Sequence, residues 1–257
     1  MHKLRFLLFI SFLCIYSVSK SQNGTTMKKI SSGAYVPLYG SNDSKVVVQE
    51  FLLDEYPVTN QQFLVFVKDQ PSWSKSQVIS LFADDNYLDK WSGDFVLGKD
   101  MKPNSPVTTI SWYAAKAYCK IQQKRLPTMD EWEYAAMASE TKPNAQADSL
   151  FNQQIIEGYE TPKTYTKLVG STFKNYWGIY DLHGLVWEWT YDFNSVLISG
   201  ESRKDVDTDK NLFCAGGSVG ASDLMDYAAF MRYAFRGSIK ANYGIRNLGF
   251  RCAKTIE

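Results

Sequence analysis

The sequence predicts a single domain of mixed helices and strands in which loops make up much of the chain. The chain contains 7 Trp, 16 Tyr and 16 Gly residues, a composition more typical of an irregular fold than of a helical bundle. Short β-branched and aromatic runs alternate with a few amphipathic stretches that begin at helix-capping residues. No repeat, low-complexity tract or linker divides residues 27–257, so we expect one domain there.

Size and charge narrow the class of protein. The 257 residues are 45% hydrophobic, which is enough to bury a sizeable core. The 28 Lys and Arg residues nearly balance the 27 Asp and Glu residues, and the formal net charge is +1. No block of basic residues offers a track for phosphates, so the composition argues against a nucleic-acid partner.

Residues 1–21 are predicted to be a signal peptide. A basic start is followed by an apolar run from Phe6 to Val18, which is too short to span a bilayer comfortably. Small residues then supply a plausible cleavage point before Gln22. Cys14 lies in a poor lipobox, which favours a soluble periplasmic or secreted protein without a membrane span after cleavage. The alternative is an uncleaved anchor.

The first third of the mature chain contains two predicted strands and a helix. The β-branched and aromatic runs at 33–38 and 46–53 are typical of strands. Thr59 and Gln62, three residues apart, form a capping box for a helix over 60–69.

Two further helices are expected in the middle of the chain. Ser111 is the N-cap of a helix that ends near residue 123. Thr128 and Glu131 form a second capping box, which predicts a helix over 129–138.

The remaining segments have weaker patterns. Residues 73–91 predict a short helix and a loop, and the polar stretch 139–175 predicts long surface loops. Residues 213–219 indicate a strand with a close backbone approach. Residues 225–236 fit either a helix or an irregular run, and 247–252 predict a closing strand.

Chemistry is concentrated in residues 178–190. Asp181 and Glu188 are hard oxygen ligands seven positions apart, and Gly184 between them allows a tight turn. Calcium takes six to eight oxygens from carboxylates, carbonyls and water. The alternative interpretation is a buried strand-turn-strand whose aromatic residues are simply core.

Six separated segments resemble, in this order, the formylglycine-generating enzyme (sulfatase-modifying factor) family. They cover nearly the whole mature chain: 56–60, 110–119, 124–134, 184–189, 216–218 and 247–252. The resemblance implies one α+β domain with little regular secondary structure, similar to C-type lectins.

The resemblance also implies that the family's redox chemistry is missing. Its oxidase members hold copper on two cysteines after the Gly-Gly-Ser segment, whereas Ala221 and Ala228 stand here. Thiolates are soft ligands suited to copper(I), and alanine cannot replace them. A second branch binds iron through histidines, but His183 is the single histidine of the mature chain. We therefore expect neither copper nor iron, no formylglycine generation, and a structural, hydrogen-bonded His183.

Two structural features are carried over from the family. A structural Ca²⁺ would be held by the side chains of Asp181 and Glu188 and by main-chain carbonyls of two residues between them, Gly184 and Val186. Cys119 and Cys252 match a disulfide pair of the family. Cys214 is then left as either a buried small hydrophobe or a reactive thiol.

Residues 213–252 resemble a cysteine-free subgroup of accessory proteins to copper nitrite reductases. This implies a pseudoenzyme that assists a periplasmic copper enzyme in denitrification. The former catalytic cleft would be the binding surface, lined by Trp187, Ser218, Tyr227, Met231 and Arg232.

Two rival functions remain open. One is a metal-dependent oxidoreductase of the same fold with an altered active site, using Cys214 or the thioethers of Met225 and Met231. The other is a lectin-like glycan binder, in which exposed Trp residues would serve as stacking platforms.

Overall fold

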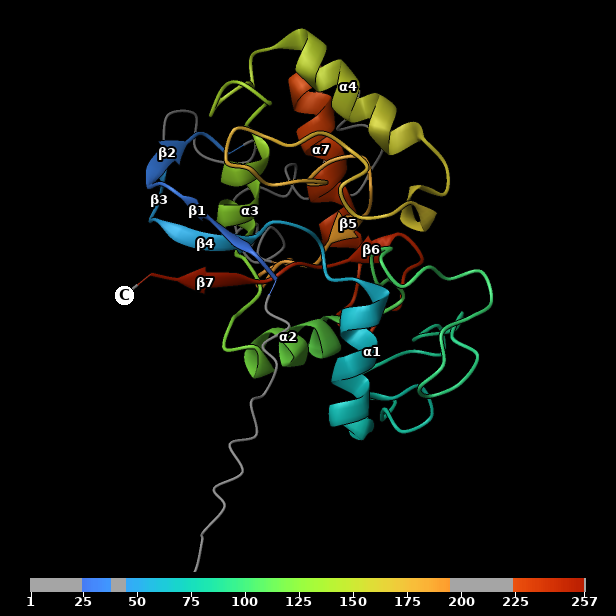
Figure 1. Cartoon of the computed structure of the whole chain (residues 1–257). Coiled ribbons are helices and arrows are strands. Elements are labelled where there is room, and N and C mark those ends of the chain that lie inside the picture. Colours follow the sequence, from blue (N-terminus) through green and yellow to red (C-terminus); the bar gives the residue numbers. More distant parts are fainter. Residues whose placement is uncertain (1–24, 38–44, 195–223, 257) are drawn as a thin grey trace, which may run out of the picture.

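The computed structural model describes residues 25–37, 45–194 and 224–256 (Figure 1). Its elements are β1 (Met27–Ile30), β2 (Gly33–Tyr35), β3 (Val46–Val48), β4 (Phe51–Asp54), α1 (Asn60–Asp69), a 3-10 turn (Pro71–Trp73), α2 (Trp112–Ile121), α3 (Met129–Ala136), α4 (Ser149–Glu160), a second 3-10 turn (Thr164–Thr166), β5 (Trp187–Glu188), α7 (Leu224–Ser238), β6 (Leu248–Gly249) and β7 (Ala253–Thr255). Short strands and helices joined by long irregular segments confirm the predicted α+β class.

The sheets are small and join distant parts of the chain. β4 lies between β1 and β7, antiparallel to both, with Leu53 opposite Lys28 on one side and Ala253 on the other. β2 and β3 form a separate antiparallel pair. β5 and β6 pair in parallel, which places Trp187 opposite Leu248. The closing segment of the chain thereby reaches both the first strands and the 178–190 turn.

The three helices with capping signals are confirmed. Thr59 and Gln62 form both hydrogen bonds of a capping box at the start of α1. Ser111 caps α2 by accepting a hydrogen bond from the amide of Ala114. Thr128 and Glu131 form the second complete capping box at the start of α3.

The prediction of surface loops over 139–175 is wrong, because α4 lies in this stretch. Asp148 caps it by accepting hydrogen bonds from the amides of Leu150 and Phe151. Phe151 and Ile155, one turn apart, are buried on its inner face. The apolar stripe of α4 is narrow and its other residues are mostly polar, so the sequence shows only a weak helical periodicity here. The open choice for 225–236 is decided in favour of a helix, α7.

The strand predictions need smaller corrections. Residues 46–53 divide into β3 and β4, which belong to different sheets. β1 was not predicted, and the last strand starts at Ala253, one residue after the expected closing strand ends. A short pair with β5 accounts for Leu248 and Gly249 within that expected strand.

Two large apolar clusters form most of the core, and one of them covers a face of the three-stranded sheet. One packs α1 and α2 around Phe63, Tyr118 and Phe250, and the other packs α3 against the sheet through Trp132 and Leu53. Figure 1 shows α4 and α7 above the three-stranded sheet in this view, and α1 and α2 below β7.

The predicted disulfide between Cys119 and Cys252 is present, with the two Cα atoms 5.6 Å apart. It joins α2 to the residue that precedes β7. The predicted signal peptide, the strand expected at 213–219, Cys214 and Ser218 lie outside the described residues.

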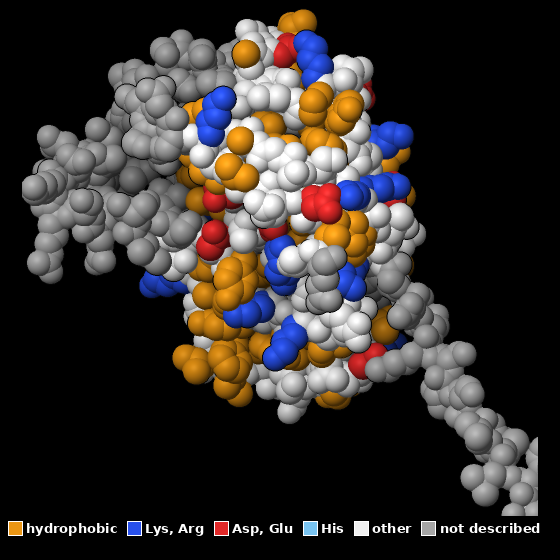
Figure 2. Space-filling model, turned by 90° about the vertical axis from the view of Figure 1, so that its left-hand side faces the viewer, with side chains coloured by type: hydrophobic (Ala, Val, Ile, Leu, Met, Phe, Trp, Pro, Cys, Tyr) orange, Lys and Arg blue, Asp and Glu red, His pale blue; other side chains and the backbone are white. Residues whose placement is uncertain are grey.

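The surface is chemically mixed. On the face shown in Figure 2, basic, acidic and apolar side chains are interspersed, as the near-neutral composition leads one to expect. Within the described ranges, no helix is both long and apolar enough to cross a membrane.

Candidate functional site

The 178–190 turn is buried, and its first carboxylate is bound by the protein itself. Asp181 is completely buried in a left-handed conformation (φ 61°), and Gly184 has φ 80°. The Asp181 carboxylate accepts hydrogen bonds from the backbone amides of Gly170 and Thr172 and from the Thr172 hydroxyl. Positive φ at Gly184 confirms that the turn uses the conformational freedom of glycine.

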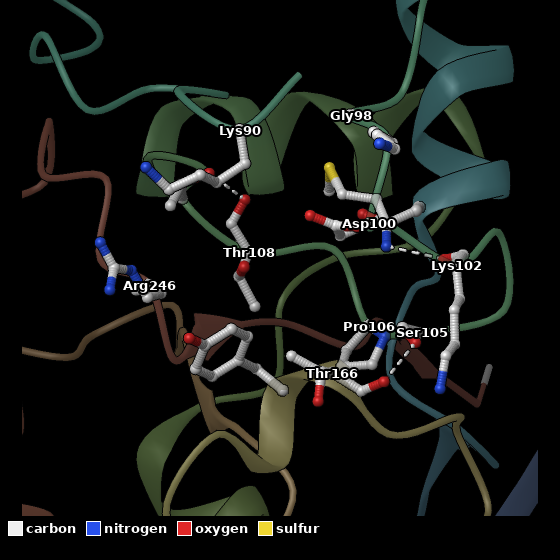
Figure 3. Close-up of a pocket in the computed structure, with 14 residues that line it drawn as sticks. Lys90, Gly98, Asp100, Lys102, Ser105, Pro106, Thr108, Thr166 and Arg246 are labelled. Carbon is white, nitrogen blue, oxygen red and sulfur yellow. Dashed lines mark hydrogen bonds between the residues drawn. The ribbon is translucent and has the colours of Figure 1, made fainter. Parts of the chain in front are cut away.

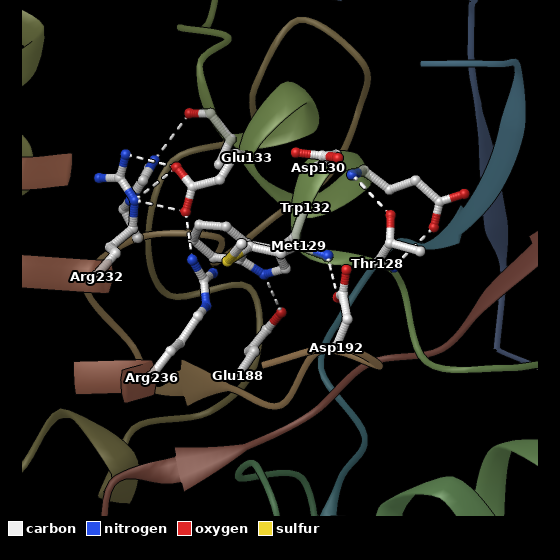
Figure 4. A network of polar contacts seen from close by, with 12 residues as sticks. Thr128, Met129, Asp130, Trp132, Glu133, Glu188, Asp192, Arg232 and Arg236 are labelled. Atoms are coloured by element: carbon white, nitrogen blue, oxygen red, sulfur yellow. Dashed lines mark hydrogen bonds and ion pairs between the residues drawn. The ribbon is translucent and has the colours of Figure 1, made fainter. Parts of the chain in front are cut away.

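The second carboxylate, Glu188, lies in a buried ion pair. The Arg251 guanidinium donates hydrogen bonds of 2.8 and 2.9 Å to its two oxygens, and both side chains are 0% exposed. The indole of Trp132 donates a further hydrogen bond of 2.8 Å to Oε2 (Figure 4). A charge-assisted, bidentate pair of this kind fixes the carboxylate in one orientation.

Both carboxylates of the predicted calcium site already have partners within the protein. Three hydrogen bonds converge on Asp181, and the positive charge of Arg251 already balances Glu188. Among the residues that the structure describes, no group of three or more His, Cys, Asp and Glu side chains could hold a metal ion. Calcium binding therefore stays a prediction of the resemblance, and nothing below depends on it.

A second buried network joins α3 to α7. Glu133 on α3 accepts hydrogen bonds of 2.7 to 3.0 Å from Arg232 and another from Arg236 (Figure 4). Burial alone would raise the pKa of Glu133, but the charges and hydrogen bonds of the two arginines lower it to about 2. The Arg236 guanidinium also lies 4.7 Å from the centre of the Trp132 ring.

His183 is hydrogen-bonded at both ring nitrogens. Its Nε2 lies 2.8 Å from the carbonyl of Ala136, so this nitrogen carries the proton, and Nδ1 accepts from the Tyr159 hydroxyl at 3.1 Å. Burial, assisted by the nearby charge of Arg232, lowers the pKa of His183 to about 3. The imidazole is thus neutral near pH 7, and its two hydrogen bonds agree with the predicted hydrogen-bonded residue.

The predicted cleft residues are only partly brought together. Trp187 on β5 packs between Tyr159 (4.7 Å between ring centres) and Phe235 (4.8 Å). Arg232 reaches the same neighbourhood because it donates to the Tyr159 hydroxyl at 3.3 Å, although its main partner is Glu133.

Tyr227 and Met231 are half-buried on α7, one turn apart, and no hydrogen bond or ion pair between described residues joins them to this network. Sequence reasoning missed Tyr159 and Glu133. Tyr159 lies in α4, and the Asp148 cap is the only feature of the sequence that indicates this helix. The sequence does not indicate that Glu133 is buried, because a charged residue on a short amphipathic helix normally faces solvent.

Ala228 occupies the position where the family resemblance places a copper-binding cysteine. It is 1% exposed and belongs to an apolar cluster with Ala145, Phe151 and Ile155. Position 228 therefore lies in the contact between α7 and the segment around α4. Ala221, the other aligned position, lies outside the described residues.

A cavity of about 380 Å³ opens beside Trp187. Tyr159, Lys163, Arg246 and Asn247 are among its lining residues. The backbone amide of Trp187 donates to the carbonyl of Asn247 at 2.8 Å, and the pairing of β5 with β6 holds the two walls together. This cavity is the hollow that adjoins the predicted cleft.

Comparison with known proteins decides the family. A model of the sulfatase-modifying factor enzyme 1-like domain matches residues 18–256. The chain belongs to the sulfatase-modifying factor family. This family assignment confirms the resemblance to formylglycine-generating enzymes, while the nitrite reductase subgroup stays a prediction.

Relatives in the family differ in activity and in length. The formylglycine-generating enzyme of Streptomyces coelicolor is 31% identical over 255 residues, which cover 82% of this chain and 80% of that enzyme. The inactive C-alpha-formylglycine-generating enzyme 2 of Bos taurus is 26% identical over 249 residues, with 81% and 78% covered. Serine/threonine-protein kinase pkn1 of Chlamydia pneumoniae is 27% identical over 222 residues. Those residues cover 83% of this chain but 34% of that kinase, so the chain spans about a third of its length.

Proposed function

We propose that this chain is an exported, non-catalytic member of the sulfatase-modifying factor family that acts as a binding or accessory protein. The observation that carries the proposal is the loss of both copper thiols, with Ala221 and Ala228 in their places. Ala228 is also packed into an apolar cluster against α4 and does not line the cavity beside Trp187. An inactive relative of similar length in Bos taurus indicates that the family includes such proteins.

The proposed partner is a copper nitrite reductase, on the likeness of residues 213–252 to its accessory proteins. The proposed binding surface is the cavity beside Trp187, whose exposed rim includes Arg246. Export to the periplasm, inferred from residues 1–21, would bring the two proteins into one compartment.

The described residues do not supply the particular features that the sequence predicts for the two rival functions. Met231 is half-buried on α7, and no group of three or more His, Cys, Asp and Glu side chains among the described residues could hold a metal ion; Cys214 lies outside those residues. All seven Trp residues lie in the described ranges and none of them is exposed, so only half-buried rings such as Trp187 could serve as the stacking platforms expected of a lectin-like protein.

Binding can be tested with the mature chain, residues 22–257, immobilised and titrated with the copper nitrite reductase of the same organism. We expect saturable binding that weakens in Arg246→Glu and is unchanged in Lys254→Glu, an equal change of charge on an exposed residue of β7. No binding, or equal loss in both variants, would contradict the proposed surface and partner. Copper or iron at unit stoichiometry in the purified protein would instead favour the oxidoreductase.

A further inference from the structure

A second cavity, of about 290 Å³, lies apart from the predicted cleft. It is enclosed by the loop 98–102, by residues 105–109 and by the 3-10 turn Thr164–Thr166 (Figure 3). It shares only Tyr165 and Arg246 with the cavity beside Trp187. Neither the family resemblance nor the proposed function gives it a role.

The floor of this cavity carries a hydroxyl without a partner. Thr108 is 7% exposed, yet its hydroxyl makes no hydrogen bond to any described residue. The hydroxyls of two neighbouring residues form hydrogen bonds within the chain. The Thr109 hydroxyl donates to the Thr108 carbonyl at 2.6 Å, and the Ser105 hydroxyl donates to the Thr166 carbonyl at 3.3 Å. Figure 3 shows Thr108 between Lys90, Arg246 and Thr166. The Thr108 hydroxyl is thus left for a molecule that enters the cavity.

The rim is positively charged. Lys99, Lys102 and Arg246 are exposed and have no ion-pair partner among the described residues, whereas Lys90 pairs with its neighbour at 2.6 Å. The carboxylate of Asp100 is likewise outside any ion pair of the described chain. The three unpaired positive charges outnumber this single carboxylate, so the field around the hollow favours an anion.

The floor is held in a strained conformation. Thr109 has φ 54°, which is unusual for a β-branched residue, and Leu88 opposite has φ 48°. The Leu88 amide donates to the Thr109 carbonyl at 2.9 Å, and the Thr109 amide donates to the Ile245 carbonyl at 3.1 Å. Strained backbone persists where its surroundings enforce it, and it is concentrated at functional sites.

We propose that this cavity binds a sugar acid, that is, a single hexose unit carrying a carboxylate. The carboxylate would meet Lys99, Lys102 and Arg246, while Asp100 would accept hydrogen bonds from sugar hydroxyls and would repel a bare anion. Thr108 can donate to or accept from a further hydroxyl. The Tyr165 ring and the Met101 side chain line the cavity and offer an apolar contact to the C–H groups of the sugar.

The site goes beyond the proposed accessory role and does not depend on it. Titration of the mature chain with glucuronate, glucose and acetate, followed by calorimetry or by NMR, tests it directly. We expect saturable binding of glucuronate that salt weakens. Glucose and acetate should bind about tenfold more weakly or worse, because glucose lacks the carboxylate and acetate lacks the sugar hydroxyls.

Variants assign the binding to this cavity. Lys102→Gln and Thr108→Val should each weaken glucuronate binding about fivefold or more, whereas Lys254→Gln, with the same loss of charge on β7, should not. Lys102 lines this cavity and not the one beside Trp187, so the result is independent of the nitrite reductase test.

A glucuronate oligosaccharide distinguishes the source of the ligand. Tighter binding of the oligosaccharide would identify an acidic polysaccharide, and equal binding would identify the free sugar acid. No saturable binding of glucuronate, equal affinity for glucose or acetate, or wild-type affinity in Lys102→Gln and Thr108→Val would overturn the proposal.

Discussion

At the scale of single residues, His183 makes the stability of the folded state depend on pH. Its folded pKa of about 3 lies below the ordinary value of 6.5, so only the unfolded chain takes up the proton near neutrality. The stability it contributes is therefore fully present above pH 6.5 and is lost as pH falls from there toward 3.

We expect the free energy of unfolding, measured by urea titration, to fall between pH 7 and pH 5. This fall should be much smaller in His183→Gln, since the carboxylates titrate mainly below this window. An unchanged slope in the variant would contradict a buried, neutral His183.

The ion pair between Glu188 and Arg251 is the second feature at this scale. Arg251 also donates to the carbonyls of Asp54 and Tyr180, so it connects β4 with the 178–190 turn. Arg251→Ala would leave the Glu188 charge buried and unpaired, and should lower the free energy of unfolding by about 3–5 kcal/mol.

The matched control is Lys29→Ala, which breaks a pair with Glu50 whose side chains are 56% and 44% exposed. Its cost should be about 1 kcal/mol or less in the same denaturation experiment. Similar losses in the two variants would mean that the Glu188–Arg251 pair is not buried as described.

At the scale of elements, Ala228 holds α7 close to α4. The residue is almost completely buried against Phe151 and Ile155, and α4 and α7 lie side by side (Figure 1). Ala228→Leu should overfill this contact and lower the free energy of unfolding by about 1–3 kcal/mol. Ala229→Leu, at a half-buried position on the same helix, should cost less. An equal or greater loss at Ala229 would contradict the packing of α7.

The same scale shows what the sequence could and could not predict. Helices that begin with a Ser or Thr cap, such as those after Thr59, Ser111 and Thr128, were predicted because the cap is a local signal. α4 was missed because its buried stripe is narrow, and its Asp148 cap stands in a polar segment.

The buried network could not be read from the sequence for a different reason. Glu133 and Arg232 are 99 positions apart, and nothing local indicates that they meet. By contrast, the order of the family's motifs along the chain predicts the fold class and the disulfide from the sequence alone.

At the scale of the whole molecule, the Cys119–Cys252 disulfide closes a loop of 133 residues. In the chain-entropy model, a loop of this length stabilises the folded state by about 4–5 kcal/mol, an upper estimate. The double variant Cys119→Ser, Cys252→Ser should therefore unfold at a much lower urea concentration than the oxidised wild-type protein. Reducing the wild-type protein should reproduce this change. Peptide mapping that finds Cys214 in a disulfide with either residue would contradict the pairing.

The central claim is that this member of the family has lost formylglycine generation. It is tested most directly by incubating the purified mature chain with copper and a peptide that carries the cysteine of a sulfatase substrate, followed by mass spectrometry. The formylglycine-generating enzyme of Streptomyces coelicolor serves as the positive control. We predict that the peptide cysteine remains unchanged, because alanines at 221 and 228 supply no thiolate for copper. Copper-dependent conversion of the cysteine to formylglycine by this chain would contradict the claim.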